Sequence, residues 1–248
     1  MRLDRVIAVR TGKTVYRDGE NCIKVFAGDY SADEVLNEAL NQARAECAGL
    51  NVPCVRSVMQ TEGRWAISSD YIPGKSLGVL MKEYPEKRDE FLSLFVGVQR
   101  LIHSVKPVLT GTKEKIMRKI LRAEIGEDLR EDLLFRFEAM PQGKALCHGD
   151  YNPTNVVLRQ DGIPFIVDWS HASVGDPTAD AARTRLSFLL SGDGQAAREY
   201  VSLYCRQSGT EEEEIRKWMP FVAAAMSVDA NADDRGILLS RLAEDRWE

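Results

Sequence analysis

Two acids and one amide in the sequence could act together in catalysis: Asp150, Asn155 and Asp168. Asn155 begins a short apolar segment, residues 155–158, and Asp168 ends a second one, residues 164–168. The linker between them contains an Asp-Gly pair, which is typical of tight hairpin turns. Such a hairpin would bring Asn155 and Asp168 together, and their side-chain oxygens are ligands that suit Mg²⁺. Asp150 would then be available to orient an attacking hydroxyl.

The residues around these three resemble the motifs of a known family. His148-Gly149-Asp150 with Asn155, then Asp168, then Gly175-Asp176-Pro177 and Asp180 look like the aminoglycoside phosphotransferase and choline kinase family. The resemblance implies that Asp150 is the catalytic base, that Asn155 and Asp168 bind Mg²⁺, and that Asp176 and Asp180 brace the loop. Several spacings must match at once, so the match is more specific than a single motif.

The resemblance implies an α+β, bilobal, protein-kinase-like fold. Residues 1–72 would form a small N-terminal nucleotide-binding lobe, an antiparallel β-sheet with one helix, which ends in a hinge. Residues 73–248 would form a larger, mainly helical C-terminal lobe for catalysis and acceptor binding. The pattern agrees, because short segments rich in strand-forming residues precede residue 72 and helical spacing follows it.

Individual elements follow from the same pattern. A capping box at Ser31 and Glu34 predicts the start of the one helix in the first part. Pro73-Gly74 is expected to end the sheet. The expected strands cover residues 5–9, 14–17, 21–26, 54–59 and 65–72, and the last helices residues 181–191, 195–208, 211–229 and 233–247.

A lysine and a glutamate of the first part could bind phosphate. Lys24 shares one strand face with Cys22, so that a charge is held among apolar neighbours. Glu38 flanks the apolar face of the helix and can reach Lys24, which is the ion pair that fixes the phosphate-binding lysine of kinase-like sites. Glu34 and Glu46 compete for this role, but Glu34 follows the strand too closely and Glu46 lies two turns further on.

The remaining nucleotide contacts are implied by the resemblance. Ser69-Asp70-Tyr71-Ile72 would be the hinge whose backbone binds adenine, and Cys22 would form part of the ceiling over the base. The loop before the second strand has a single glycine where a protein kinase has three, so few backbone N–H groups could contact phosphate. Gly12, Lys13 and Thr14 are the candidates for that contact.

The predicted reaction is Mg²⁺-dependent transfer of the γ-phosphoryl group of ATP, with GTP left open, to a hydroxyl of a small molecule. A net charge of −5 and the lack of a visible basic stripe argue against a nucleic-acid partner, so a cationic or neutral acceptor fits better. Aminoglycosides, choline, amino sugars, fructosamines, homoserine and methylthioribose all stay open as acceptors, because the motifs handle nucleotide and metal.

Two competing hypotheses have less support. A protein kinase is disfavoured, because Trp169-Ser170 replaces the Phe-Gly that would follow the metal-binding acid and no Ala-Pro-Glu segment follows. A nucleotide-binding pseudokinase without turnover is supported only by the phosphate loop, which has a single glycine.

The only acidic run, Glu211-Glu212-Glu213-Glu214, is interpreted as a solvated first turn of a helix. The alternative is an acidic wall for a polyamine acceptor, to which Asp229, Asp233 and Asp234 could contribute.

The sequence favours a protein that stays in the cytoplasm. No apolar run of about 18 residues is present, as a membrane helix would need, and the first residues lack the apolar core of a signal peptide. Five scattered cysteines without a Cys-x-x-Cys pair indicate reduced thiols. Oligomeric state is left open.

Overall fold

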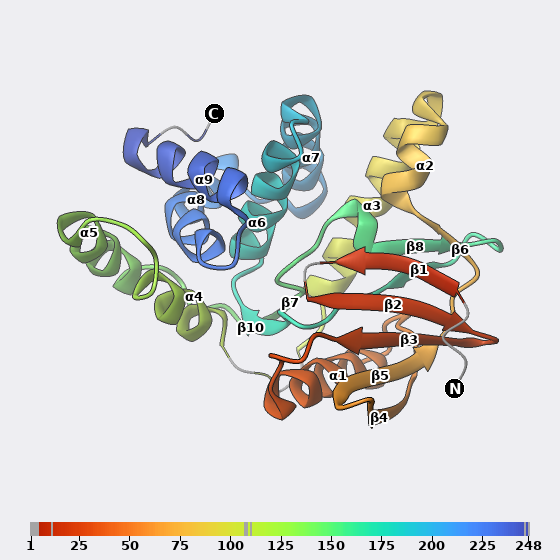
Figure 1. The fold of residues 1–248 in the computed structure, drawn as a ribbon. Coiled ribbons are helices and arrows are strands. Elements are labelled where there is room, and N and C mark those ends of the chain that lie inside the picture. The colour runs from red at the N-terminus through yellow and green to blue at the C-terminus, as the bar shows by residue number, and fades with distance from the viewer. Residues whose placement is uncertain (1–4, 11, 107–108, 110, 246, 248) are drawn as a thin grey trace. The chain divides into compact units, whose positions relative to one another are not determined.

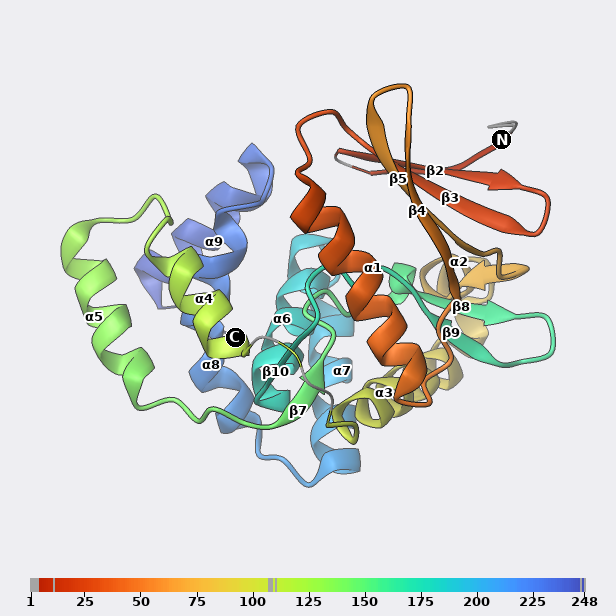
Figure 2. The same cartoon turned by 90° about the horizontal axis from the view of Figure 1, so that it is seen from below.

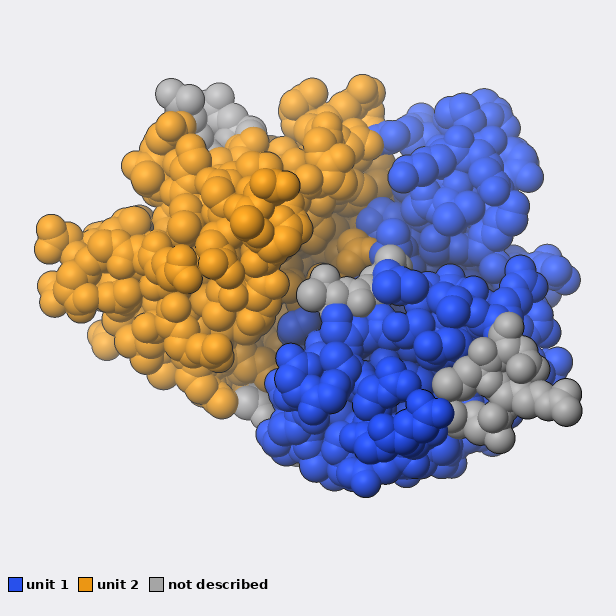
Figure 3. Space-filling model, viewed as in Figure 1, with its two compact units in different colours: residues 1–91, 153–172 blue, residues 92–152, 173–248 orange. Residues whose placement is uncertain are grey.

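The computed structural model describes residues 5–10, 12–106, 109, 111–245 and 247 (Figure 1). The chain forms two compact units, shown in different colours in Figure 3. Unit 1 consists of residues 1–91 and 153–172, and unit 2 of residues 92–152 and 173–248. The predicted β-hairpin therefore belongs to unit 1, whereas the loop with Asp150 belongs to unit 2.

Unit 1 contains a five-stranded antiparallel sheet with the strand order β1-β2-β3-β5-β4. A smaller sheet has the order β6-β8-β9. The elements are β1 (Arg5–Arg10), β2 (Lys13–Asp18), β3 (Asn21–Phe26), α1 (Ala32–Cys47), β4 (Val55–Thr61), β5 (Arg64–Asp70), β6 (Gly74–Ser76), α2 (Leu77–Glu83), a 3-10 turn (Pro85–Lys87), a second 3-10 turn (Pro153–Asn155), β8 (Val156–Arg159) and β9 (Pro164–Ile166).

Helix α1 packs along one face of the larger sheet, against β4 and β5 (Figure 2). It begins at the predicted capping box, in which the Ser31 N–H donates to Glu34 Oε2 at 2.9 Å. Its buried face carries Val35 and Ala39, which pack against Phe26 and Ile67 of the sheet. Each fully buried large apolar side chain of this kind contributes about 1.5–3 kcal/mol to folding. The sheet and α1 therefore hold each other in place.

Unit 2 is mainly helical. A short two-stranded sheet, β10-β7, lies beside the helices. Helix α3 (Arg88–His103) belongs to this unit from Leu92 onward. The other elements are α4 (Thr112–Ile120), α5 (Glu127–Glu138), β7 (Ala145–Cys147), β10 (Ser173–Gly175), α6 (Pro177–Leu190), α7 (Gly194–Ser208), α8 (Glu212–Ser227) and α9 (Ala232–Glu244).

Aromatic side chains fill the core of unit 2. Phe95 of α3 stacks on Tyr151 with ring centroids 4.3 Å apart, and it meets the edges of Phe188 and Tyr200. The Tyr151 hydroxyl also donates a 2.7 Å hydrogen bond to the Phe95 carbonyl. This packing fixes the residue next to Asp150 in the chain.

Pro73-Gly74 ends the five-stranded sheet as expected, and Gly74 then begins β6, which pairs with β8 in the smaller sheet. A Cβ at Gly74 would lie 2.2 Å from the Leu158 carbonyl oxygen, so this pairing needs glycine. Two helix bounds differ from the sequence-based expectation. Helix α6 begins at Pro177 instead of residue 181, since proline is tolerated at the first helical position. Helix α9 ends at Glu244, where Asp245 takes a left-handed conformation with φ 50°.

No helix in the described part of the chain is long and apolar enough to cross a membrane.

Candidate active site

A cavity of about 210 Å³ in unit 1 collects most of the predicted nucleotide and metal residues. Asp150 belongs to unit 2, and Gly12 and Thr14 are not part of the lining. The predicted residues that line the cavity are Lys13, Cys22, Lys24, Glu38, Ser69, Asp70, Tyr71, Ile72, Asn155 and Asp168.

Two lysines and two acids form an ion cluster at this cavity. Lys24 Nζ lies 2.5 Å from Glu38 Oε1, and Lys13 Nζ lies 2.9 Å from Glu38 Oε2. Both amines also face Asp168 Oδ1, at 3.2 Å from Lys24 and 3.7 Å from Lys13. Glu38 is 2% exposed, so each of its oxygens needs a partner. The predicted Lys24–Glu38 ion pair is present, and Lys13 as a second partner of Glu38 was not expected.

The cluster shifts the pKa values of its members. Burial by itself would lower the pKa of Lys24, but the attraction of Glu38 and Asp168 outweighs it and raises that pKa above its ordinary value. Burial would raise the pKa of Asp168, but Lys24 and Lys13 hold it well below its usual range. Both groups therefore stay charged at neutral pH.

The sheet sets the position of Lys24. It pairs with Val15 of β2 and with Ile67 of β5. Its neighbours Ile23 and Val25 point to the other face, where they are buried in a separate apolar cluster. The strand alternation therefore aims Lys24 at the cavity.

The turn between β1 and β2 sets the position of Lys13. Gly12 has φ 71°, and a Cβ there would lie 2.8 Å from the ring of Tyr30. The Gly12 carbonyl accepts a 2.8 Å hydrogen bond from the Ala27 N–H, which ties the turn to the end of β3. Lys13 Nζ lies 5.4 Å from the centroid of the Phe26 ring and 5.8 Å from that of Tyr30. Aromatic packing thus directs this amine toward Glu38.

The hairpin brings the chain segments of the two predicted metal ligands together. Val156 pairs with Ile166, and the Val167 N–H donates to the Asn155 carbonyl at 2.9 Å, so Asn155 lies beside the residue before Asp168. Asp168 has φ 65°, a left-handed conformation that costs a non-glycine residue about 1–3 kcal/mol. The surrounding structure maintains this strain and thereby aims the carboxylate at the cavity.

The donor set of the hairpin fits Mg²⁺. This ion commonly takes one or two carboxylates from the protein and completes its octahedron with water and substrate phosphates. Asn155 and Asp168 supply one amide and one carboxylate, and the described residues contain no group of three or more His, Cys, Asp or Glu that would hold a metal alone. Asn155 is 5% exposed.

A buried amide on α1 supports the metal-binding segment, and sequence reasoning missed it. Asn41 Nδ2 donates to the Trp169 carbonyl at 3.2 Å, and the Trp169 indole donates to the Ile166 carbonyl at 3.1 Å. These two bonds fix the chain on both sides of Asp168. The only sequence signal for this role is the place of Asn41 one turn after Glu38.

In unit 2, Asp180 braces the loop that carries Asp150. Its carboxylate accepts the N–H groups of Gly149 at 2.7 Å and His148 at 3.3 Å, and lies 3.0 Å from His103 Nε2. Burial would raise the pKa of Asp180, but the hydrogen bond with His103 outweighs it, with help from the charge of the two histidines and the Gly149 N–H, and lowers that pKa to about 2. The brace is as the resemblance implied, and His103 supports it.

Sequence reasoning also missed Gln99 and Arg183. Gln99 Nε2 lies 3.3 Å from Asp180 Oδ2, and the Tyr200 hydroxyl donates to its other end at 2.7 Å. Arg183 Nη2 of α6 lies 3.7 Å from Asp150 Oδ1. A cation therefore stands beside the predicted base, whose side chain is 31% exposed.

The acids proposed as an alternative acceptor wall are engaged within unit 2. Glu211 and Glu214 form the capping box of α8, as a solvated first turn would. Asp229 forms an ion pair with Lys119, and Asp234 bonds to Asn231 at the start of α9. In the same helix turn, Glu212 pairs with Arg185 and Glu213 with Arg216.

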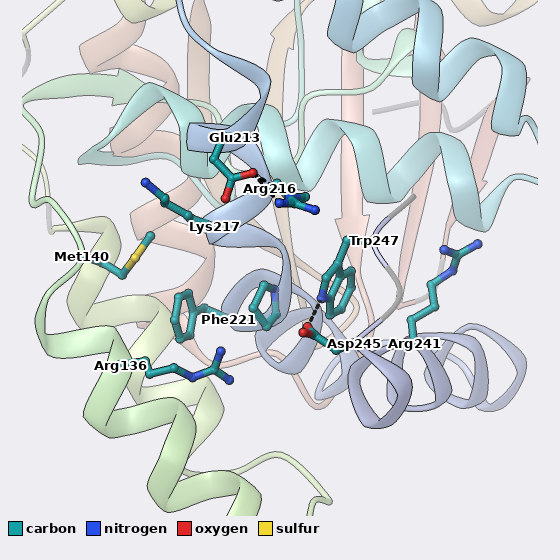
Figure 4. Close-up of a pocket in the computed structure, with 10 residues that line it drawn as sticks. Arg136, Met140, Glu213, Arg216, Lys217, Phe221, Arg241, Asp245 and Trp247 are labelled. Carbon is teal, nitrogen blue, oxygen red and sulfur yellow. Dashed lines mark hydrogen bonds and ion pairs between the residues drawn. The ribbon is translucent and has the colours of Figure 1, made fainter.

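A second cavity, about 660 Å³, lies within unit 2 between α5, α8 and the end of α9. Figure 4 shows the rings of Phe221 and Trp247 with several cationic side chains around them. Among these are Arg216, which pairs with Glu213 at 2.6 Å, and Lys217. The lining includes none of the predicted catalytic, nucleotide or metal residues, although Glu213 of the alternative acidic wall belongs to it.

Residues 5–218 match the model of the family described as the phosphotransferase enzyme family. No curated protein sequence gives a significant match.

Solved structures of similar fold include a thermostable mutant of aminoglycoside phosphotransferase APH(4)-Ia in a ternary complex with ADP and hygromycin B. It is 17% identical, has a TM-score of 0.71, and the match covers 96% of this chain and 91% of that one. The choline kinase LicA from Streptococcus pneumoniae is 16% identical, with a TM-score of 0.65 and coverage of 98% and 94%. A choline/ethanolamine kinase family protein from Mesorhizobium loti is 18% identical, with a TM-score of 0.65 and coverage of 98% and 86%. These similarities confirm the predicted protein-kinase-like fold.

Proposed function

The chain belongs to the phosphotransferase enzyme family, and from that premise we propose that it transfers the γ-phosphoryl group of ATP to a hydroxyl of a small molecule with the help of Mg²⁺. Membership confirms the predicted enzyme class, a small-molecule phosphotransferase. The observation that carries the finer proposal is the cluster of Lys24, Glu38, Lys13 and Asp168 at one cavity. Phosphoryl transfer needs charged groups that are already in position, and this cluster holds them there before any ligand binds.

Unit 1 would bind the nucleotide. Ser69-Asp70-Tyr71-Ile72 would contact adenine through the backbone, with Cys22 above the base, since all five line the cavity. Lys24 would contact the phosphates, while Glu38 keeps its amine in place. Lys13 would supply a second charge where the loop has few N–H groups to offer.

Asn155 and Asp168 would hold Mg²⁺. When bound, the ion would neutralise charge on the phosphate oxygens of the nucleotide. Lys13 and Lys24 face Asp168, so both amines lie next to the proposed metal ligand and could contact phosphate there.

Asp150 would orient the acceptor hydroxyl and accept its proton. The loop supports this role, because Asp180 holds the backbone on one side and Tyr151 is locked into the aromatic core on the other. An ordinary carboxylate suffices as a base if proton transfer is late, because most of the acceleration comes from positioning and charge stabilisation. We also propose that the boundary between the nucleotide-binding lobe and the catalytic lobe follows Ile72.

The acceptor would carry a hydroxyl group. One similar structure binds hygromycin B and others are choline kinases, so the fold accommodates hydroxyl compounds of quite different size. The complete set of Lys24, Glu38, Asn155 and Asp168 counts against a module that binds nucleotide without turnover.

Consumption of ATP and GTP tests the proposal. Wild-type protein with Mg²⁺ should release ADP or GDP only when a suitable acceptor is present, and Asp150→Asn should remove that stimulation. Nucleotide binding is measured separately, as the rise in Tm with Mg²⁺-ATP. Binding without stimulation by any hydroxyl compound in a broad panel would contradict transfer to small molecules.

A further inference from the structure

The side chain of Gln99 lies at the centre of a polar network inside unit 2. Gln99 belongs to α3 and is completely buried, as are Thr184 of α6 and Tyr200 of α7. Its Nε2 donates to Thr184 Oγ1 at 3.1 Å and to Asp180 Oδ2 at 3.3 Å, and its Oε1 accepts from the Tyr200 hydroxyl at 2.7 Å. Both N–H donors of the amide are therefore used, as burial of a polar group requires.

The hydrogen bonds of this network have a fixed direction. An ionised carboxylate only accepts, so the nitrogen of the Gln99 amide must face Asp180 and its oxygen must face Tyr200. Thr184 Oγ1 accepts from Gln99 and donates its own proton to the Tyr151 carbonyl at 2.9 Å. A chain of donors thus runs from the Tyr200 hydroxyl to the backbone of Tyr151. Hydrogen bonds in such a chain polarise and strengthen one another.

The other branch of the network reaches the backbone that precedes Asp150. Asp180 accepts the N–H groups of Gly149 and His148. Gly149 has φ 77°, a conformation that is only one of several a glycine adopts freely, so the bond to Asp180 is what fixes the turn. One side-chain amide therefore joins two anchors of the loop. Asp180 holds the backbone before Asp150, and Thr184 holds the backbone after it.

We infer that Gln99 is a positioning residue for Asp150, because its amide keeps the two anchors at a fixed separation and so holds the carboxylate between them in place. The inference rests on the proposed function, in which Asp150 orients the acceptor hydroxyl. A displacement of about 1 Å at a reacting group lowers the rate by about a hundredfold in well-studied enzymes. An apolar side chain of the same size would fill the same space, but Asp180 and Thr184 would lose the group that joins them.

Variants of similar shape test the network with little change in packing. Gln99→Met removes the amide, and Thr184→Val removes the hydroxyl that bonds to Tyr151. Each should lower kcat by at least about tenfold, as loss of positioning does. The KM for ATP and the Mg²⁺-ATP shift in Tm should stay, because neither residue lines the cavity of unit 1. Thr184→Ser keeps the hydroxyl and should retain most of the wild-type kcat.

Two comparisons separate positioning from a general loss of stability. The double variant of Gln99→Met and Thr184→Val should lose little more kcat than the worse single variant, because residues of one hydrogen-bond network do not act independently. Leu133→Val, at a fully buried position of α5, should lower the Tm but leave kcat unchanged at temperatures well below it. A merely structural role of Gln99 would make Gln99→Met behave as this control does.

Hydrogen exchange of the loop gives a second measurement, which needs no acceptor. A peptide of residues 146–152 contains the N–H groups of His148 and Gly149, which Asp180 protects. Gln99→Met should exchange in this peptide at least about tenfold faster than the wild type at a temperature where both are folded, since local opening sets the rate. Leu133→Val should exchange there as the wild type does.

An active wild type with unchanged kcat in Gln99→Met would overturn the inference, and so would an equal loss of kcat in Leu133→Val. If Gln99→Met does not fold, Thr184→Val and Thr184→Ser carry the same comparison. If the wild type transfers phosphate to no hydroxyl compound, the proposed function fails and hydrogen exchange decides the inference alone. Faster exchange of the loop would then support its anchoring by Gln99, and unchanged exchange would overturn it.

Discussion

The ion cluster of unit 1 and the loop of unit 2 that carries Asp150 hold their acids in different ways. In unit 1, Lys13 and Lys24 face Glu38 and Asp168, so that cations and acids balance. In unit 2, Asp180 is held by the backbone N–H groups of Gly149 and His148 and by the ring of His103. Side-chain amines can turn toward a phosphate, whereas backbone N–H groups keep their place in the loop. The balanced cluster therefore suits ligand binding, and the second arrangement keeps Asp150 in position.

The largest expected effect is the loss of Asp150, the proposed base on the loop of unit 2. Asp150→Asn should lower kcat by about 10²–10⁴-fold, as loss of a general base does. The Mg²⁺-ATP shift in Tm should stay, because Asp150 does not line the cavity of unit 1.

Steady-state kinetics and thermal melting of the same preparation measure both effects. Unchanged kcat would show that Asp150 is not the base. Loss of the Tm shift would break the comparison, because Asp150 would then contribute to nucleotide binding.

The second-largest expected effect concerns Asp180, which stabilises the loop of unit 2 and thereby raises the free energy of unfolding. Its pKa of about 2 is depressed from the ordinary value of 3.8. It therefore stabilises the fold by about 2 kcal/mol at pH values above about 4. This contribution disappears as the pH falls through about 2. Urea unfolding of wild type and Asp180→Asn should differ by that amount at pH 6 and clearly less at pH 3.

A pH-independent difference between these two proteins would mean that packing, not charge, makes Asp180 important. Asp176→Asn is a control in the same segment, because Asp176 caps α6 by accepting from the Thr178 N–H.

Lys13 should matter less than Lys24, because it is the added member of the balanced cluster. Lys24→Met leaves Glu38 with one amine and should abolish detectable Mg²⁺-ATP binding at moderate concentration. Lys13→Met should weaken binding only about tenfold, the size of one charge-assisted contact. Calorimetry at two salt concentrations measures both, and the Lys13 effect should shrink with added salt. Equal losses of Mg²⁺-ATP affinity would show that the two amines bind the nucleotide jointly.

The sequence predicted the parts of the site that depend on local patterns. Strand alternation aims Lys24, the Asp-Gly turn brings Asn155 and Asp168 together, and the Ser31 cap begins the helix that carries Glu38. Each of these needs only a short stretch of chain and one rule of geometry.

Other parts depend on contacts between distant segments, which local patterns do not show. Asn41 bonds to Trp169 across the fold of unit 1, and Gln99 meets Asp180 in unit 2. Arg183 lies within the predicted helix of residues 181–191, but its nearness to Asp150 depends on how α6 packs beside the loop, which helical spacing does not show.

Lys115 allows the smallest test, that of an amine in unit 2 whose pKa burial lowers, whereas acids raise the pKa of Lys24 in unit 1. Its pKa of about 8 lies below the ordinary 10.5, so the folded protein binds fewer protons than the unfolded one between these values. The charged amine therefore destabilises the fold fully below pH 8, and the cost disappears as the pH rises toward 10.5. Lys115→Met should gain about 1 kcal/mol at pH 7, after allowance for screening by solvent.

Urea unfolding at pH 7 and pH 9.5 measures this gain, which should shrink at the higher pH. Lys82→Met, on an exposed position of α2, should show neither effect. A gain that does not change with pH would mean that the charge of the Lys115 amine is not what lowers the stability of the fold.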